Sequence, residues 1–269
     1  MYLERLHVKS LLFEEELKSS NNHWEGLLFK LLCKNFGLKV NGDAFFSIAQ
    51  SIDFSIIKKC NHDKLALEAL LFGQAGFFEV NKEDSYFELL KSRYLYLRHK
   101  FDLDNNSVNF PKYFRLRPSN FPTIRLSQIA VLFSEKQSLF SRIIEAKSLK
   151  DYYALFTISA NEYWDSHFNF GISSTKNKKR LTQKFIDLLL INTIIPLKYS
   201  YAKYMGQDAS EEIMNLASTI PSEENSIIKK FNQLVPIAKN SLQSQALLQL
   251  KNEYCIKNKC IQCAVGNSI

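Results

Sequence analysis

The feature that most constrains the fold of this chain is the spacing of its apolar residues, which recur at the three- and four-residue intervals of an amphipathic helix. One such stripe is formed by Trp24, Leu27, Leu28, Leu31 and Leu32. Only eight glycines and six prolines interrupt the 269 residues, which is too few for a β-sandwich with many turns. The pattern predicts an all-α fold, a compact multi-helix domain of two helical layers.

Local signals place the ends of several helices. Asn22 with Glu25 resembles a capping pair, and Gly37 is a helix stop. A helix over residues 64–72 is expected to close at Gly73. The next helix, over residues 84–100, is expected to carry Phe87, Leu90, Tyr94 and Leu97 on one face. Further helices are expected near residues 123–133, 136–146, 178–204, 210–217, 223–234 and 241–254.

The helical periodicity is lost between Phe101 and Pro122, where three prolines and an Asp/Asn-rich run occur. We interpret this stretch as a loop between two helical layers. The sequence therefore predicts a single helical domain over residues 1–269. A subdivision is possible between an N-terminal layer, residues 1–104, and a C-terminal layer with a cysteine-rich tail, residues 105–269.

Composition excludes several classes of protein. With 46% hydrophobic and 23% charged residues, the chain has the composition of a globular protein and not of a disordered one. The longest apolar stretch, residues 185–197, contains Asp187 and Asn192 and is shorter than the roughly 20 residues that span a bilayer. The N-terminus has no signal-peptide core. We expect a cytoplasmic protein with no membrane contact and with reduced thiols.

The net charge of +8 favours contact with a polyanion, so DNA or RNA is the expected partner. Three of the eight arginines, Arg115, Arg117 and Arg125, flank Pro122, which suits the first position of a helix. Arginines beside the free amides of a helix N-terminus would bind phosphate. The alternative is that these arginines brace the loop internally, because a long loop must satisfy its own backbone polar groups.

A second basic segment contains Lys176, Lys178, Lys179 and Arg180. This run could touch a nucleic-acid backbone without reading its sequence. The alternative is a solvated helix face with no ligand.

Glu162, Asp165 and His167 are the residues closest to a catalytic constellation. Two acids and an imidazole could transfer protons or bind a metal. However, their spacing matches no metal-binding helix motif, and no nucleophile elbow or phosphate-binding glycine loop accompanies them. We favour a structural turn that ends at Gly171, and we expect no catalytic residue in this chain.

The last fifteen residues contain Cys255, Cys260 and Cys263. Their spacing suits a zinc ion or an iron–sulfur cluster, but either centre needs a fourth ligand. Cys60 or His62 is the preferred fourth ligand, and Cys33 and His167 are further candidates. The alternatives are half-buried thiols that pin the tail, or redox chemistry.

Several segments together resemble a bacterial family called domain of unknown function 2851. They are residues 68–76, the Arg-Leu-Arg-Pro run and its continuation at residues 115–126, and residues 191–196, 244–248 and 254–266. The resemblance implies that this chain corresponds to the C-terminal helical part of the family. Members carry a further N-terminal region that looks nuclease-like, with acidic and Glu-x-His elements, and nothing here matches it. The resemblance therefore implies no catalytic residue.

Three functions are compatible with these patterns. The leading hypothesis is a non-catalytic helical accessory module that contacts nucleic acid through its basic segments. The alternative is a protein-interaction or structural domain with a metal- or thiol-pinned C-terminus. The third is part of a nuclease-like enzyme whose catalytic region is absent from this chain.

Overall fold

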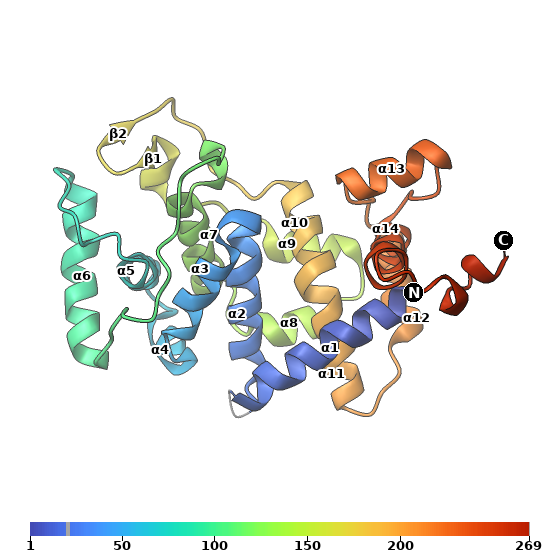
Figure 1. The fold of residues 1–269 in the computed structure, drawn as a ribbon. Coiled ribbons are helices and arrows are strands. Elements are labelled where there is room, and N and C mark those ends of the chain that lie inside the picture. The colour runs from blue at the N-terminus through green and yellow to red at the C-terminus, as the bar shows by residue number, and fades with distance from the viewer. Residues whose placement is uncertain (20–21, 269) are drawn as a thin grey trace. The chain divides into compact units, whose positions relative to one another are not determined.

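The computed structural model describes residues 1–19 and 22–268 and confirms the all-α fold (Figure 1). The α-helices are α1 (Tyr2–Ser19), α2 (Trp24–Phe36), α3 (Leu38–Gln50), α4 (Phe54–Cys60), α5 (Lys64–Gln74), α6 (Ser85–Phe101), α7 (Pro122–Glu135), α8 (Leu139–Glu145), α9 (Leu149–Phe156), α10 (Gln183–Leu189), α11 (Ile195–Tyr204), α12 (Ser210–Thr219), α13 (Ser226–Leu234) and α14 (Ser241–Gln249). The 3-10 and π-helical turns are η1 (Pro118–Asn120), η2 (Glu162–Asp165), η3 (Leu190–Ile194), η4 (Leu250–Cys255), η5 (Cys260–Gln262) and η6 (Gly266–Ser268). In these described ranges the only strands are β1 (His167–Asn169) and β2 (Ile172–Ser173), which form an antiparallel hairpin.

The chain divides into two compact units, each assembled from separate stretches of sequence. Unit 1 contains residues 1–22, 147–151 and 190–269. Unit 2 contains residues 23–146 and 152–189. The boundary expected at residues 104–105 falls inside unit 2, in the loop that follows α6.

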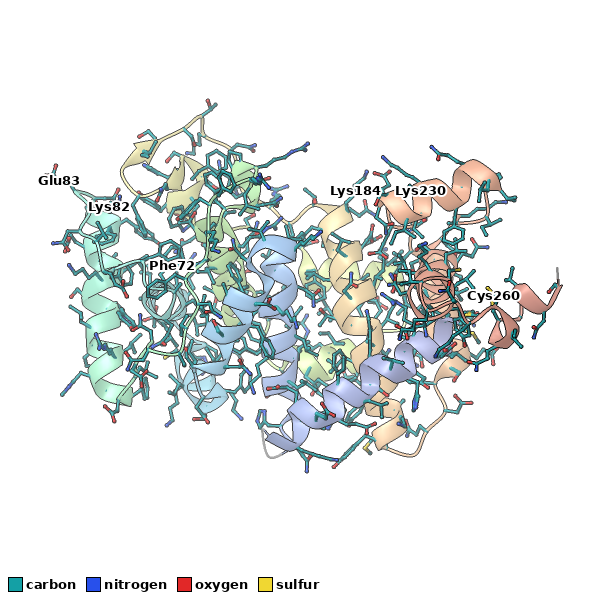
Figure 2. The ribbon with its side chains drawn as sticks, viewed as in Figure 1. Phe72, Lys82, Glu83, Lys184, Lys230 and Cys260 are labelled. Carbon is teal, nitrogen blue, oxygen red and sulfur yellow. The ribbon has the colours of Figure 1, made fainter. Side chains whose placement is uncertain are left out.

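The core of unit 2 is built around α5, which packs against α6 and α7. Phe72, labelled in Figure 2, is fully buried in α5, where its ring stacks on Trp164 at a centroid distance of 5.6 Å. The apolar face expected on α6 is confirmed, because Phe87, Leu90, Tyr94 and Leu97 are its buried residues. Helical periodicity in the sequence thus identified the faces that pack.

The expected end of α5 at Gly73 is wrong, because the helix continues to Gln74. A Cβ atom on Gly73 would lie 2.1 Å from Cδ2 of the Tyr94 ring. The glycine therefore allows α5 and α6 to approach closely, rather than ending the helix.

Two other helix starts differ from expectation. The N-cap of α2 is His23, whose Nδ1 accepts a hydrogen bond from the Gly26 amide at 2.9 Å, and not Asn22. The helix expected from residue 178 begins only at Gln183. The preceding residues form sheet-like backbone bonds instead, from the Ala160 amide to the Lys179 carbonyl at 3.1 Å and from the Leu181 amide to the Ile158 carbonyl at 3.1 Å. Tertiary pairing therefore overrides helical propensity here.

Unit 1 holds both ends of the described chain (Figure 1). In this unit α1 packs against α11 and α14. The Arg5 guanidinium donates through Nε to Oε1 of Gln245 at 2.6 Å, and the Tyr254 hydroxyl donates to Oε1 of Glu4 at 2.9 Å. These bonds connect the first helix to the last ones, although the partners are more than two hundred residues apart in sequence.

The longest apolar stretch is not a membrane span. Its helix changes to a π-turn at Leu190–Ile194, just before Pro196, whose missing N–H and bulky ring disturb regular α-helical bonding. None of the helices described for residues 1–19 and 22–268 is both long and apolar enough to cross a bilayer.

Candidate functional site

Arg125, in the first turns of α7, is an internal brace of unit 2. Its side chain is only 6% exposed. Nη1 donates to Oε1 of Gln128 at 2.8 Å, and Nη2 donates to Oδ1 of Asn120 at 2.6 Å. The guanidinium carbon lies 3.6 Å from the centroid of the Phe185 ring. Burial lowers the pKa of Arg125 to about 10, since both hydrogen-bonding partners are neutral amides.

The brace continues from Gln128 into the lysine run. Nε2 of Gln128 donates to the carbonyl oxygen of Lys179 at 2.8 Å. The Lys179 side chain is itself buried, and its Nζ donates to the carbonyl oxygens of Asp165 at 3.1 Å and Asn177 at 3.0 Å. Burial lowers the pKa of Lys179, while Asp165 opposes that effect. Arg125 and Gln128 therefore hold two distant loop segments, residues 117–121 and 176–180, on one helix.

The other predicted basic residues are exposed. Arg115 and Arg117 lie in the loop before η1, and Arg115 adopts a left-handed backbone with φ of 61°. The Arg115 guanidinium lies 5.0 Å from the centroid of the Phe114 ring, whose residue is 73% exposed. Within the described chain, neither arginine forms an ion pair. The exposed basic residues anchored around α7, here called the α7 basic set, are Arg115, Arg117, Lys176, Lys178 and Arg180.

A hollow of about 410 Å³ in unit 2 brings several predicted residues together. Its charged lining consists of Lys64, Lys178 and Arg180 and of Glu135, Glu162 and Asp165. Three cations therefore face three carboxylates, so the hollow has no net excess of either charge. We call it the mixed-charge hollow.

His167 does not join the two acids in this hollow. Its ring stacks on Tyr163 at a centroid distance of 4.1 Å, and its Nδ1 lies 2.9 Å from the Tyr163 carbonyl oxygen. The imidazole is thus engaged in packing the turn before β1. The hollow therefore brings charged groups together, and among the residues that line it in the described chain there is no histidine.

The cysteine tail lies in unit 1, beyond α14, where Figure 2 labels Cys260. Cys255 and Cys260 are exposed, whereas Cys263 is 5% exposed. In the described part of the chain, no three His, Cys, Asp or Glu side chains form a group that could hold a metal ion. The three thiols in their present arrangement thus do not fit a metal centre.

The proposed fourth ligands belong to unit 2. Cys60 is buried at the end of α4, and Nδ1 of His62 lies 3.3 Å from Nε2 of Gln137. Cys33 is fully buried, and this burial raises the pKa of its thiol. All five cysteines are free thiols.

Sequence reasoning missed a buried carboxylate, Glu68, at the centre of unit 2. Its Oε2 accepts hydrogen bonds from the Tyr86 hydroxyl at 2.9 Å and from Nδ2 of Asn161 at 2.9 Å, and its Oε1 accepts one from Nε1 of Trp164. Burial raises the pKa of Glu68, although these hydrogen bonds, and one from Ser127, act in the opposite direction. The available signal was a single acid inside the apolar run of residues 65–72.

Comparison with known proteins identifies a family. Residues 1–226 match the family described as protein of unknown function (DUF2851). No curated protein and no solved structure matches the chain. The resemblance carried by residues 68–76, 115–126 and 191–196 falls within the matched range, whereas residues 244–248 and the cysteine tail lie beyond it. Since the match covers most of the 269 residues, the chain belongs to the DUF2851 family.

Proposed function

We propose that unit 2 is a nucleic-acid-binding accessory module that contacts phosphates through the α7 basic set. The observation that carries the proposal is the Arg125 brace. One buried guanidinium, through Asn120 and Gln128, connects both exposed basic segments to the same helix. Such an arrangement pre-organises cations that would otherwise lie on unrelated loops.

The exposed state of Arg115 and Arg117 also supports this proposal over an internal role for both residues. An arginine that braces a loop buries its guanidinium, as Arg125 does. Arg115 and Arg117 keep theirs in solvent, without a carboxylate partner in the described chain. Exposed arginines of this kind form bidentate contacts with phosphate. The expected contacts are with the backbone of DNA or RNA in the cytoplasm and carry no sequence specificity.

Fluorescence anisotropy with a labelled oligonucleotide tests this proposal. Affinity is expected to fall steeply between 50 mM and 200 mM salt, since each phosphate contact contributes about one unit to the log–log salt slope. The double variants Arg115→Ala/Arg117→Ala and Lys178→Ala/Arg180→Ala should each weaken binding and reduce that slope by about 1 to 2.

The matched control is Lys229→Ala/Lys230→Ala, which removes the same charge from exposed positions of α13 in unit 1 (Figure 2 labels Lys230). This control should retain the affinity of the unmodified protein. The proposal fails if the control weakens binding as much as the α7 variants do, or if no oligonucleotide binds at low salt.

We further propose, from the spacing of its cysteines, that the tail binds one zinc ion or an iron–sulfur cluster. Binding would require the exposed thiols of Cys255 and Cys260 to move towards Cys263, because they do not form a metal-binding group as folded here. Elemental analysis of purified protein tests this: about one equivalent of zinc, or an iron–sulfur absorbance lost in Cys260→Ser, would support it. Metal-free protein with three titratable tail thiols would contradict it.

A further inference from the structure

Unit 2 contains a second hollow, of about 370 Å³, where α4 and α6 end and α5 begins. Its polar lining consists of Lys59, Cys60, Asp63, Arg93, Tyr96 and Lys100. We call it the α4–α6 hollow. It shares no residue with the α7 basic set or with the mixed-charge hollow.

Two cations of the α4–α6 hollow, Lys59 and Lys100, lie near the same aromatic ring. Nζ of Lys59 lies 5.7 Å from the centroid of the Phe101 ring, and Nζ of Lys100 lies 5.4 Å from the same centroid. The same Nζ of Lys100 lies 5.6 Å from the centroid of the Tyr96 ring. Both ammonium groups lie near the same aromatic ring, so an anion bound beside that ring would be attracted to both.

A third cation, Arg93, completes the group. Its Nη2 pairs with Oδ2 of Asp63, which is the only acid in the lining. Both side chains of this pair are exposed, at 47% and 38%, so water screens the pair and the guanidinium can rotate towards a ligand. The lining therefore has three cations and one carboxylate.

The buried thiol of Cys60 lines the same hollow as the three cations. Burial raises its pKa above the usual range; Lys100 lowers it, Asp63 raises it further, and Arg93 and Lys59 lower it. All three cations, and the one carboxylate of the lining, therefore act electrostatically on this thiol. A raised pKa disfavours the thiolate, so we treat this thiol as a lining group of the hollow.

The ends of the helices offset only part of this charge. Each helix terminus carries about half an elementary charge, negative at the C-terminus and positive at the N-terminus. The C-termini of α4 and α6 therefore offset about one cation, and the N-terminus of α5 restores about half of it. After Asp63 is included, an excess of between one and two positive charges is left.

We propose that the α4–α6 hollow binds the phosphate monoester of a nucleotide, with Lys59, Arg93 and Lys100 around the phosphate. A phosphate monoester carries about −1.5 to −2 charges at neutral pH, which matches this excess better than a carboxylate does. The Tyr96 side chain, 58% exposed beside the cations, offers its ring for stacking with a base. The volume lies at the lower end of the range for small-molecule sites. This inference does not rest on the function proposed above.

Isothermal titration calorimetry of the full chain tests the proposal with adenosine 5′-monophosphate, adenosine and inorganic phosphate. The nucleotide is expected to bind at least about ten-fold more tightly than either of the others, because only it engages both the cations and the ring. Lys59→Ala, Lys100→Ala and Tyr96→Ala should each weaken nucleotide binding by about five-fold or more. The matched control is Lys58→Ala, an exposed lysine next to Lys59 that does not line the hollow.

Opposite results would overturn the proposal. They are equal binding of nucleotide and adenosine, equal binding of nucleotide and inorganic phosphate, no nucleotide binding at millimolar concentration, or a Lys58→Ala effect as large as that of Lys100→Ala. Tryptophan fluorescence verifies that each variant is folded, because both tryptophans, Trp24 and Trp164, lie in unit 2.

A second arm distinguishes two sources of the same phosphate, a free nucleotide and the end of a strand. Oligonucleotides with a 5′-phosphate and with a 5′-hydroxyl are compared on the unmodified protein and on Lys100→Ala. If the unmodified protein prefers the 5′-phosphate and Lys100→Ala abolishes that preference, the site binds the end of a strand. If the unmodified protein shows no such preference, the site binds a free nucleotide. The Arg115→Ala/Arg117→Ala variant leaves the α4–α6 hollow intact, so it should retain nucleotide binding. A failure of the nucleotide proposal can therefore be distinguished from a failure of the proposed oligonucleotide binding by the α7 basic set.

Discussion

Nδ2 of Asn161 donates a hydrogen bond to Oε2 of Glu68 at 2.9 Å and joins two buried residues that are 93 positions apart in the sequence. Tyr86 and Trp164 donate to the same carboxylate. One acid on α5 thereby connects α6 and the segment around η2. In the part of the chain that the structure describes, no cation pairs with this carboxylate. A buried carboxylate held only by neutral donors is expensive to form and also expensive to disrupt.

Replacing Glu68 should strongly destabilise unit 2. Glu68→Ala leaves the donors of Tyr86, Asn161 and Trp164 unpaired, so we expect a loss of about 3–5 kcal/mol in the free energy of unfolding. Glu68→Gln keeps one acceptor oxygen and should cost about 1–2 kcal/mol. Urea unfolding followed by tryptophan fluorescence measures this, because both tryptophans lie in unit 2. The control Glu88→Gln, at an exposed position of α6, should change stability by less than about 0.5 kcal/mol.

The raised pKa of Glu68 also predicts a pH dependence. A carboxyl whose pKa is higher in the folded state binds protons more tightly there, so its contribution to stability is complete below about 4.3, its unfolded value. That contribution is lost as the pH rises through the folded pKa. The unmodified protein should therefore gain stability relative to Glu68→Gln as the pH is lowered from neutral towards about 4.3. A difference between the two that is constant with pH would show that Glu68 titrates alike in both states.

Much of the fold could be predicted from the sequence, because helix faces depend on local periodicity. The buried face of α6 is confirmed, because its buried residues are the four that the helical spacing placed on one face. The errors occur where residues that are distant in the sequence determine the local structure. Gly73 reads as a stop until Tyr94 is known to lie against it. Residues 178–182 read as helical until their pairing with residues 158–160 is seen.

The candidate sites were less predictable, because burial of a charge depends on what packs around it. Arg115, Arg117 and Arg125 looked equivalent in the sequence, yet only Arg125 is buried. Lys179 turns inward while its neighbour Lys178 faces solvent. The α4–α6 hollow joins residues from three helices, and no local spacing could have indicated it.

Close packing of α5 on α6 predicts that Gly73→Ala is destabilising. In a helix without such contacts the change would stabilise by about 1 kcal/mol, because alanine is the better helix former. Here the new methyl group would overlap the Tyr94 ring, so we expect a net loss of about 2–3 kcal/mol. The tryptophan-detected urea transition of unit 2 reports this loss. In a Tyr94→Leu background the penalty should shrink by at least about 1 kcal/mol, whereas equal penalties in both backgrounds would place the clash elsewhere.

The Arg125 brace predicts that lysine cannot replace arginine at this position. Arg125→Lys retains the charge but cannot reach Asn120 and Gln128 together in the planar geometry of a guanidinium. We expect a loss of about 2 kcal/mol in the stability of unit 2. Oligonucleotide affinity should also fall, although no exposed cation is removed. Unchanged stability and affinity would mean that the loop segments hold their positions without the brace.

Lys9 in unit 1 predicts a gain of stability at alkaline pH. Burial, together with the charge of Arg5, lowers its pKa to about 8, while Glu223 opposes this and Nζ lies 3.4 Å from Oδ1 of Asn192. A lysine with a lowered folded pKa holds its proton less tightly in the folded state than in the unfolded one. Unfolding therefore takes up a proton between pH 8 and the ordinary lysine value of about 10.4, and stability rises with pH across this window.

The variant Lys9→Met removes this dependence. Its stability should exceed that of the unmodified protein at pH 7 and approach it at pH 9.5, and the total difference should be at most about 3 kcal/mol. Unit 1 contains no tryptophan, so its unfolding is followed by far-UV circular dichroism and distinguished from the tryptophan transition of unit 2. Lys18→Met, an exposed lysine on the same helix, is the control and should leave the pH dependence unchanged. A parallel pH profile for Lys9→Met and the unmodified protein would show that the Lys9 ammonium is hydrated in the folded state.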